Sequence, residues 1–215
     1  MKKIVSIIPI KMNNERLPGK NTKDLAGKPL IHYVQENLLA VDEISECYVY
    51  CSNSDISRYL LPGIMFLSRP EALDLPSSNF NQIFDSFSAQ VDADVYVYAH
   101  ATAPFIEVET TRECIQKVLS GEYDSAFCAS RIQDYLWQDN VPLNFDATNV
   151  PRSQDLKPIY RETSGVYVFT KESYKSCHRR IGLNPYIKEV SLKEAIDINN
   201  PEDFELAKIF AKPSF

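Results

Sequence analysis

Apolar and polar residues alternate along the chain in blocks that predict strands separated by helices. Residues Ile4 to Ile10 are nearly continuous in apolar and β-branched side chains, which is typical of a central strand covered on both faces. The next ten residues, Lys11 to Lys20, are polar and are broken by Pro18-Gly19, so we expect a loop there. We expect Pro29 in the first turn of a helix, because the apolar residues that follow it recur at helical spacing. The chain therefore opens with a strand, a loop and a helix.

The same alternation continues to the end of the chain and predicts its fold class. We expect strands near 47–51, 64–67, 95–99, 125–129, 165–169 and 187–190, and helices from 54, over 80–91, around 111–119 and from Asn200-Pro201. Strands that alternate with helices favour an α/β fold, a mostly parallel central sheet with right-handed crossovers and helices on both faces. With 215 residues we expect a single domain over residues 1–215.

One segment does not fit this alternation. Residues Gln133 to Tyr160 are irregular and rich in Asp, Asn and Pro, and they are too many for an ordinary connection. We expect an excursion from the domain over 133–160.

The predicted topology indicates where a ligand would bind. In open parallel sheets ligands bind outside the carboxyl ends of the strands. This rule selects the loops that follow the strands: 11–21, 52–55, 69–79, 100–104 and the segment around Asp197.

Composition and charge exclude several classes of protein. The 23 Lys and Arg against 29 Asp and Glu, a net charge of −6, provide no overall basic field and argue against nucleic acid as the principal ligand. No apolar run approaches the ~20 residues of a membrane span, and the first residues do not resemble a signal peptide. We therefore expect a cytoplasmic protein without a membrane partner.

The distribution of glycine, cysteine and histidine removes further possibilities. No two of the six glycines are closer than eight positions, so neither a Walker A loop nor a G-x-G-x-x-G motif is present. Five cysteines in mostly apolar segments suit reduced core thiols better than disulfides. The three histidines form no H-E-x-x-H motif, which argues against a zinc site.

Three cations and an amide follow the first predicted strand. Lys11, Arg16, Lys20 and Asn21 lie within eleven residues, and such a cluster at a strand end suits a polyphosphate. The alternative is a solvated basic loop.

Near the other end of the chain, Asp197 follows a short apolar stretch and precedes the predicted last helix. A carboxylate in that place suits Mg²⁺, which takes few protein ligands and completes its octahedron with phosphate oxygens and water. The alternative is an Asp that only forms a turn.

Six blocks in order along the chain resemble the CMP-sialic acid synthetase (acylneuraminate cytidylyltransferase) family, relatives of CMP-Kdo synthetases. The blocks are Ile7-Ile8-Pro9-Ile10-Lys11 with Arg16-Leu17-Pro18-Gly19-Lys20-Asn21 and Leu25-Ala26-Gly27-Lys28-Pro29-Leu30-Ile31, then Cys51-Ser52-Asn53-Ser54, Arg69-Pro70-Glu71, Ala101-Thr102-Ala103-Pro104-Phe105, Pro151-Arg152-Ser153-Gln154 and Asp197-Ile198-Asn199-Asn200-Pro201-Glu202-Asp203. The resemblance implies a nucleotide-diphospho-sugar transferase-like, Rossmann-like fold.

The resemblance also implies a function and a site. It implies transfer of CMP from CTP to a sialic acid-like 2-keto sugar acid, with release of pyrophosphate, Mg²⁺ as cofactor and a homodimer whose arm, 133–160, helps complete the neighbouring site. The implied roles are catalysis by Lys20, Arg16 and Asp197, nucleotide binding by Lys11, Asn21, Asn53 and Arg69, sugar binding by Ser78, His100, Arg152, Gln154 and Arg161, and metal binding by Asp197 and Asn199.

Three positions depart from the family pattern. Lys11 stands where the family usually has Arg, and a lysine lacks the bidentate fork. His100 stands where the family often has Gln, which predicts altered sugar specificity or pH sensitivity near neutrality. Asn199 replaces the second metal-binding Asp and brings no charge to the metal.

Two other functions compete with this interpretation. A nucleotide-sugar glycosyltransferase would share the nucleotide-binding half of such a fold, but it needs an Asp-x-Asp after a mid-chain strand, where this chain has Tyr98-Ala99-His100-Ala101-Thr102. A catalytically weak nucleotide-binding paralogue would be consistent with Lys11 and Asn199.

Overall fold

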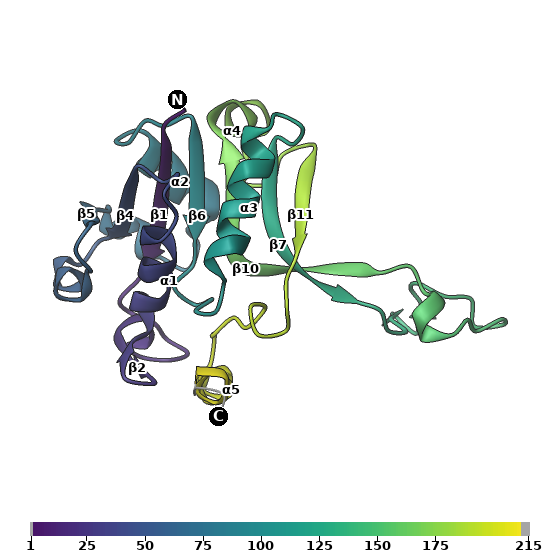
Figure 1. Cartoon of the computed structure of the whole chain (residues 1–215). Helices are drawn as coiled ribbons and strands as arrows, with labels where there is room; N and C mark the ends of the chain where they lie inside the picture. Colours follow the sequence, from purple (N-terminus) through teal and green to yellow (C-terminus); the bar gives the residue numbers. More distant parts are fainter. Residues whose placement is uncertain (1, 212–215) are drawn as a thin grey trace.

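A seven-stranded sheet in the order β11-β7-β10-β6-β1-β4-β5 forms the centre of the computed structural model, which describes residues 2–211 (Figure 1). The strands are β1 (Ile4–Ile10), β4 (Glu46–Cys51), β5 (Ile64–Ser68), β6 (Val95–Ala99), β7 (Ser125–Ile132), β10 (Ile159–Thr170) and β11 (Pro185–Glu189). Strands β1, β4, β5 and β6 pair in parallel, as do β7 and β11, whereas β10 is antiparallel to both of its neighbours. The mostly parallel sheet expected from the sequence is confirmed.

Helices cover both faces of this sheet, as expected. The helices are α1 (Leu30–Leu39), α2 (Phe80–Ser88), α3 (Val108–Leu119), α4 (Lys171–Cys177) and α5 (Pro201–Ala211), with 3₁₀ turns η1 (Lys20–Thr22), η2 (Ser54–Tyr59), η3 (Glu71–Asp74) and η4 (Ser153–Asp155). Two short hairpins pair β2 (Asp24–Leu25) with β3 (Lys28–Pro29) and β8 (Trp137–Gln138) with β9 (Val141–Pro142). Helices α1 and α3 lie on the face toward the viewer in Figure 1, and α2 lies behind it. None of the helices in residues 2–211 is both long and apolar enough to cross a membrane.

The burial pattern of β1 explains why two cores form. Ile4, Ile8 and Ile10 pack into a mainly aliphatic cluster with α1 and α3, while Val5 and Ile7 pack into an aromatic cluster with α2 and α4. Successive side chains of a strand point to opposite faces, so a strand that is apolar throughout needs helices on both sides.

The aromatic cluster is centred on α2. Phe84 is 1% exposed, and its ring lies 4.8 Å from Tyr96 and 4.5 Å from Tyr174, edge to face in both pairs. Helix α2 begins with a capping box in which the Asn79 side chain and the Gln82 side chain each bond the other's backbone N–H. This cap explains why the helix begins at Phe80.

Two elements differ from the prediction. Strand β10 begins at Ile159, not near Gly165, because its first residues pair with the end of β7 outside the main body of the sheet. Helix α4, seven residues capped by Thr170, was not predicted. Its residues Lys171 to Cys177 carry only one large apolar side chain, Tyr174, so they show no helical apolar period.

Smaller differences concern element ends. The segment from Ser54 is a 3₁₀ turn and not an α-helix, and α2 ends at Ser88 although the apolar spacing continues to Val91. Pro29 precedes α1 and pairs within a hairpin, so it does not occupy the first helical turn.

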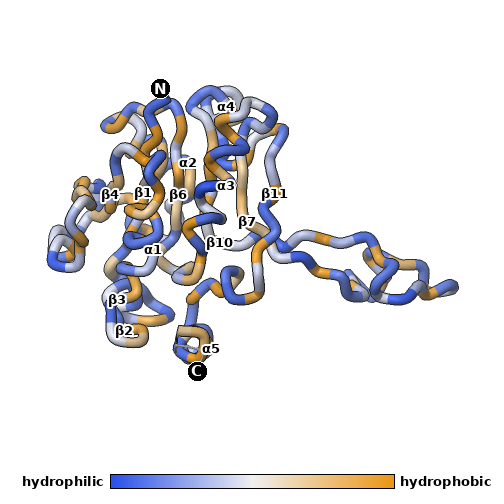
Figure 2. Tube along the Cα trace, viewed as in Figure 1, coloured by the Kyte–Doolittle hydropathy of each residue, from blue (hydrophilic) through white to orange (hydrophobic). Residues whose placement is uncertain are grey.

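The segment between β7 and β10 extends away from the sheet as an arm (Figure 1). We define the arm as residues 133–160; it contains β8, β9 and η4. Apolar and polar residues alternate along it (Figure 2). Its own contacts order it, because Tyr135 and Trp137 pack edge to face on Phe145 and the Tyr135 hydroxyl donates to the Pro151 carbonyl at 2.6 Å.

Candidate functional site

Four adjoining cavities lie at the carboxyl ends of the parallel strands, and we name each by one residue that lines it. The His100 cavity has a volume of about 360 Å³, the Lys20 cavity about 270 Å³, the Asn53 cavity about 580 Å³ and the Asp197 cavity about 720 Å³. Lys11 lines the first three, and Arg16 and Asn199 line both the Lys20 and Asp197 cavities. The four cavities therefore share walls and lie together at the edge that the topology rule selects.

Lys20 connects the first loop with the segment that precedes α5. The side chain is buried, with the residue 7% exposed, and its Nζ donates to the carbonyl of Ile198 at 2.7 Å. Burial lowers the pKa of Lys20, and the neighbouring Asp197 carboxylate opposes that change. Leu17 packs with Ile196 and Ile198 in a third apolar cluster beneath this contact. The two segments are thus held together by packing and by one buried ammonium.

The positive φ of Gly19 lets the chain turn into η1, which places Lys20 and Asn21 side by side. Gly19 has φ 67° and ψ 15°, a left-handed conformation that suits glycine. The Asn21 side chain donates to the Lys11 carbonyl at 2.9 Å and so ties the two ends of the loop together. Lys11 and Asn21 both line the His100 cavity.

Asp197 lies beside the loop cations. Its Oδ2 accepts from the Asn199 side chain at 2.8 Å, and the Oδ1 of Asn199 accepts from Arg16 at 2.9 Å. The other oxygen of Asp197, Oδ1, is buried and has no hydrogen-bond donor among residues 2–211. A buried carboxylate oxygen without a donor is costly, so a ligand or an ion that reached this atom would remove that cost.

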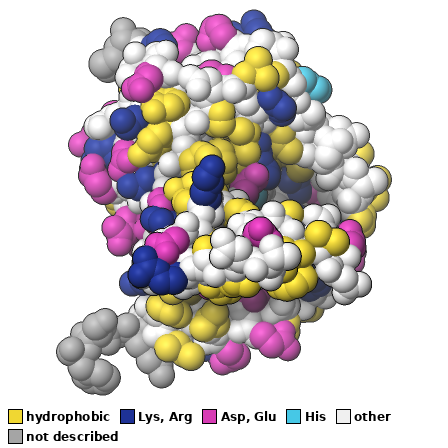
Figure 3. All heavy atoms as spheres, turned by 90° about the vertical axis from the view of Figure 1, so that its right-hand side faces the viewer, with side chains coloured by type: hydrophobic (Ala, Val, Ile, Leu, Met, Phe, Trp, Pro, Cys, Tyr) yellow, Lys and Arg dark blue, Asp and Glu magenta, His cyan; other side chains and the backbone are white. Residues whose placement is uncertain are grey.

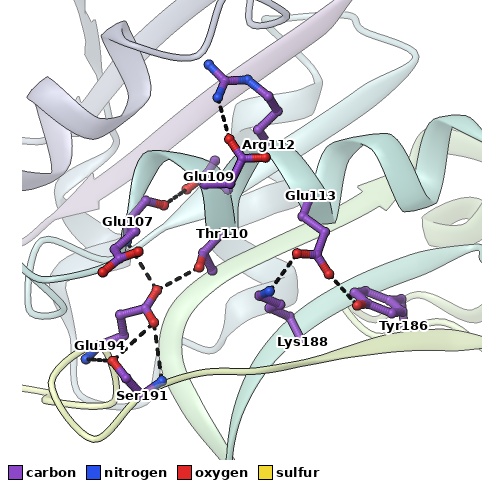
Figure 4. Close-up of polar contacts among 10 residues, drawn as sticks. Glu107, Glu109, Thr110, Arg112, Glu113, Tyr186, Lys188, Ser191 and Glu194 are labelled. Atoms are coloured by element: carbon purple, nitrogen blue, oxygen red, sulfur yellow. Dashed lines mark hydrogen bonds and ion pairs between the residues drawn. The ribbon is translucent and has the colours of Figure 1, made fainter.

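Glu194 anchors the chain between β11 and the Asp197 segment. Figure 4 shows this buried carboxylate between Ser191 and the start of α3. It accepts from the Thr110 hydroxyl at 2.7 Å and from the Glu107 backbone N–H at 3.2 Å. A carboxylate at a helix N-terminus also interacts favourably with the helix dipole. Farther along α3, Glu113 bonds Lys188 and Tyr186 of β11. These contacts fix the path of the chain toward Asp197.

Asn53 and Arg69 follow β4 and β5. The Asn53 side chain accepts from the Asp55 backbone N–H at 2.8 Å, so it caps η2 as well as lining its cavity. Arg69 is 4% exposed and forms an ion pair with Asp74, which also accepts from the Ser52 hydroxyl at 2.5 Å. Asp74 therefore neutralises a cation that the resemblance assigns to the nucleotide.

Ser78 and His100 line the same cavity, and the His100 ring packs between Tyr98 and Tyr167. Burial, assisted by the positive charge of Arg180, lowers the pKa of His100 to about 4. The ring is therefore neutral at pH 7. The expectation of pH sensitivity near neutrality is wrong for this side chain, because its surroundings disfavour the charged form.

The three remaining predicted residues divide between the site and the arm. Arg161 lines the Asp197 cavity and donates to the Ser130 hydroxyl at 3.1 Å. Arg152 and Gln154 lie in the arm and line none of the four cavities, and the Arg152 side chain pairs with Asp155 and is 72% exposed. Within one chain the structure does not bring them to the other predicted residues, because the arm extends away from the sheet (Figure 1).

A family model described as cytidylyltransferase matches residues 5–212. The chain belongs to this cytidylyltransferase family. The family resemblance inferred from the sequence motifs is thereby confirmed.

Among curated relatives, an N-acylneuraminate cytidylyltransferase from Oncorhynchus mykiss is 25% identical, over 78% of this chain and 41% of its own length. An N-acylneuraminate cytidylyltransferase from Streptococcus agalactiae is 22% identical, over 94% of this chain and 52% of its own length. A pseudaminic acid cytidylyltransferase from Campylobacter jejuni is 25% identical, over 98% of this chain and 97% of its own length. This chain thus spans about half the length of the N-acylneuraminate enzymes and nearly the full length of the pseudaminic acid enzyme.

Solved structures show the same fold at lower identity. A CMP:2-keto-3-deoxy-manno-octonic acid synthetase in complex with CTP matches with a TM-score of 0.71 and 18% identity, over 97% of this chain and 98% of that one. A 4-diphosphocytidyl-2C-methyl-D-erythritol synthase from Anaerococcus prevotii matches with a TM-score of 0.66 and 14% identity, over 97% and 96%. The expected nucleotide-diphospho-sugar transferase-like fold is confirmed.

The donor set of this cytidylyltransferase fits a magnesium ion held by few protein groups. The unpartnered Oδ1 of Asp197 is a hard oxygen ligand, and the amide oxygen of Asn199, which accepts one hydrogen bond from Arg16, has a second lone pair to offer. No three His, Cys, Asp or Glu side chains between residues 2 and 211 are grouped so as to hold a metal by themselves. A metal here would depend on phosphate oxygens for the rest of its coordination.

Several residues of the site in this cytidylyltransferase were not predicted from its sequence. Asp74 pairs with Arg69, Glu194 anchors the Asp197 segment, and Glu162 and Arg180 form an ion pair beside Tyr167 at 2.6 Å. Asp74 lies in a loop that the topology rule had already selected, so its charge was an available signal. Nothing in the local pattern distinguishes Glu162, Arg180 or Glu194 from surface charges.

The low pKa of His100 predicts a specific pH dependence of stability. Between pH 6.5 and about 4 the unfolded chain binds a proton at this histidine that the folded chain does not. We therefore expect the free energy of unfolding to decrease as the pH is lowered through that window. The substitution His100→Gln should remove this contribution to the pH dependence. Urea unfolding at pH 7, 5.5 and 4.5 measures the difference between the two proteins. Parallel pH dependences for wild type and His100→Gln would contradict the assignment.

Proposed function

We propose that this protein transfers CMP from CTP to a sialic acid-like 2-keto sugar acid and releases pyrophosphate. One observation carries the proposal: in a member of the cytidylyltransferase family, Lys20 and Arg16 of the first loop contact residues 198 and 199 beside Asp197. The relatives named for N-acylneuraminate and pseudaminic acid, at 22% to 25% identity, support the class of acceptor.

The reaction is a displacement at the α-phosphorus of CTP. A bond forms between that phosphorus and the anomeric oxygen of the sugar acid, the bond to the bridging oxygen of the β-phosphate breaks, and the proton of the anomeric hydroxyl passes to water. The protein positions two anions and neutralises their charge, and it forms no covalent bond to either.

The cations of the first loop serve the triphosphate. Lys20 and Arg16 line the Lys20 cavity with Lys11, so they can neutralise charge on the phosphates and on the departing pyrophosphate. Asp197, with Asn199 as a second candidate, would hold Mg²⁺, which reduces repulsion between the phosphates and an acceptor carboxylate. Asn21, Asn53 and Arg69 complete the nucleotide side of the site in this proposal.

The acceptor side comprises Ser78, His100 and Arg161. The neutral His100 ring can donate or accept a hydrogen bond to a sugar hydroxyl, as the amide of a glutamine would. Arg161 lines the cavity that also contains Asp197 and can pair with the acceptor carboxylate.

We also propose a homodimer in which the arm of one subunit, with Arg152 and Gln154, completes the acceptor side of its neighbour. The arm exposes Trp137, Val141, Leu143 and Val150, each between 54% and 62% exposed. Figure 3 looks at the molecule from the side of the arm and shows hydrophobic side chains gathered there. Exposed apolar residues on a projecting, internally ordered segment suit burial against a second subunit.

A catalytically weak paralogue is a second candidate, because Asn199 brings no charge to a metal and its amide oxygen already accepts from the Arg16 cation. Pyrophosphate release from CTP with a panel of 2-keto sugar acids, beside ATP, GTP and UTP, separates the two. Turnover with CTP and at least one acid supports the proposed transferase. Tight CTP binding in calorimetry without turnover of any acid supports the paralogue, and CTP-independent glycosyl transfer contradicts both.

Replacing Lys20 by Ala should lower kcat by ~10²–10³, the loss typical of one preorganised donor to developing charge. The pyrophosphate-release assay measures it. Lys23→Ala is a matched control, because Lys23 is an exposed neighbour three residues along the same loop. A near-normal rate for Lys20→Ala would remove Lys20 from this role.

Asp197→Asn should shift the Mg²⁺ requirement to higher concentration, because the carboxylate oxygen without a protein donor is lost. The measurement is initial rate against Mg²⁺ at saturating CTP. Glu202→Gln is the matched control, because Glu202 is exposed in the first turn of α5. Asp203→Asn is unsuitable, because the Asp203 carboxylate accepts from the backbone N–H groups of Asn199 and Asn200. An unchanged titration for Asp197→Asn contradicts the metal assignment.

The arm predicts complementation between two inactive variants. In a mixed dimer of Lys20→Ala and Arg152→Ala subunits, the site with an intact Lys20 receives the arm with an intact Arg152. An equal mixture that exchanges subunits should therefore recover about one quarter of wild-type activity, from half of the dimers with one of two sites intact. Sedimentation velocity checks the dimer. A monomer, or a mixture as inactive as its components, contradicts the shared site.

A further inference from the structure

Arg69 is held at both ends by the last residue of β4 and the residue after it. Its backbone N–H donates to the Cys51 carbonyl at 3.0 Å, and its guanidinium pairs with Asp74, whose other oxygen accepts from the Ser52 hydroxyl at 2.5 Å. Asp74 ends the η3 turn, and this turn brings its carboxylate back to the strand end. The Arg69 side chain is 3% exposed and that of Asp74 is 18% exposed, so solvent screens the pair weakly.

The pair forms part of the wall between two of the cavities. Arg69 lines the His100 cavity, whereas Asp74 and Ser52 line the Asn53 cavity, and Lys11 lines both. Within residues 2–211, the guanidinium makes its only hydrogen bond to Asp74, and its buried Nε has no acceptor there. Because a guanidinium has five N–H donors, Asp74 fixes the group without using up its capacity to donate.

Asp74 also changes the charge that a nucleotide meets. Three cations of the first loop, Lys11, Arg16 and Lys20, line the Lys20 cavity. Arg69 does not line that cavity, and the carboxylate in contact with it offsets its positive charge. The contribution of Arg69 to binding therefore depends mainly on the direction of its donors, and Asp74 sets that direction.

Resting on the proposed function, we propose that Asp74 is a positioning residue for the nucleotide. It holds the Arg69 guanidinium in the wall of the His100 cavity and acts on CTP through Arg69. Each oxygen of Asp74 accepts one hydrogen bond from the protein, and these two bonds fix the carboxylate between Arg69 and Ser52. Contact of this carboxylate with the phosphates would be repulsive, so its contribution comes from the cation that it orients.

The test is a double-mutant cycle that measures the affinity for CTP. Asp74→Ala and Arg69→Ala should each raise the Kd of CTP by about tenfold, and the double variant should bind as weakly as Arg69→Ala alone, within about twofold. Asp74→Asn keeps an acceptor for the Ser52 hydroxyl but loses the charge opposite Arg69, so its Kd should lie between those of wild type and Asp74→Ala. Calorimetry with CTP and Mg²⁺, without a sugar acid, measures each protein.

Stability and turnover separate this role from a purely structural one. Asp74→Ala leaves a buried guanidinium without its partner, whereas the double variant removes both charges and avoids that penalty. Urea unfolding shows whether each variant is folded under the assay conditions. In the pyrophosphate-release assay, Asp74→Asn should raise KM for CTP and keep kcat and KM for the sugar acid within about twofold of wild type. Equal losses in kcat and in both KM values would show a structural role and overturn the inference.

Asp55→Asn is the matched control. The Asp55 side chain is 60% exposed, pairs with Arg58 and lines none of the four cavities, although Asp55 lies only three residues after Ser52. This variant should bind CTP as wild type does. A further loss when Asp74→Ala is added to Arg69→Ala would show that Asp74 acts directly on the ligand, and tighter CTP binding by Asp74→Asn would show that the carboxylate only repels the phosphates. Either result overturns the inference.

The binding cycle keeps this inference separate from the proposed function. A non-additive cycle in a protein that releases no pyrophosphate with any sugar acid would support the positioning role and contradict the transferase. An additive cycle, or wild-type affinity in Asp74→Ala, in an active enzyme would leave the transferase standing and refute the positioning role. A wild-type protein that binds no CTP would contradict both.

Discussion

The contact between the buried Lys20 ammonium and the Ile198 carbonyl is the constraint on which the site depends. It joins residues 178 positions apart in the chain. An ammonium is costly to bury, and here the carbonyl and the Asp197 carboxylate offset that cost while Leu17, Ile196 and Ile198 pack beneath. If either segment moved, the cation would be left without its partners. The same contact therefore stabilises the edge of the fold and keeps a positive charge next to a carboxylate oxygen that lacks a donor.

Within the central sheet, the antiparallel strand β10 decides the shape of the His100 and Asp197 cavities. Because β10 runs against β6 and β7, its first residues lie at the carboxyl ends of the parallel strands, and Gly165 accepts from the His100 backbone N–H there. Glu162 and Arg161 come to the cavities for the same reason. The approach to β10 from β7 also produces the arm, so one reversal of strand direction accounts for both the wall of the site and the projecting apolar segment.

Much of this architecture could be predicted from local pattern. Strands β1 and β6 were predicted to the residue, because continuous β-branched or aromatic runs bounded by polar residues leave little choice of ends. The loops that carry Lys20, Asn53, Arg69 and His100 were also predicted, since each follows such a strand. Helix α4 was not predicted, because a seven-residue helix with one buried aromatic shows no helical apolar period. The antiparallel direction of β10 was not predicted either, because the residues of a strand do not indicate which way it runs in the sheet.

By itself, the sequence determined the mostly parallel α/β class, the edge of the sheet where a ligand would bind and, through its ordered motifs, the cytidylyltransferase family. Only the tertiary structure decided which charges act on which. It paired Arg69 with Asp74, left one oxygen of Asp197 without a donor and made His100 neutral through burial and the charge of Arg180. The spacing of apolar residues indicates the local secondary structure and which face of each element is buried. Protonation, pairing and exposure depend on groups that approach from distant segments, and these are settled only when the segments pack.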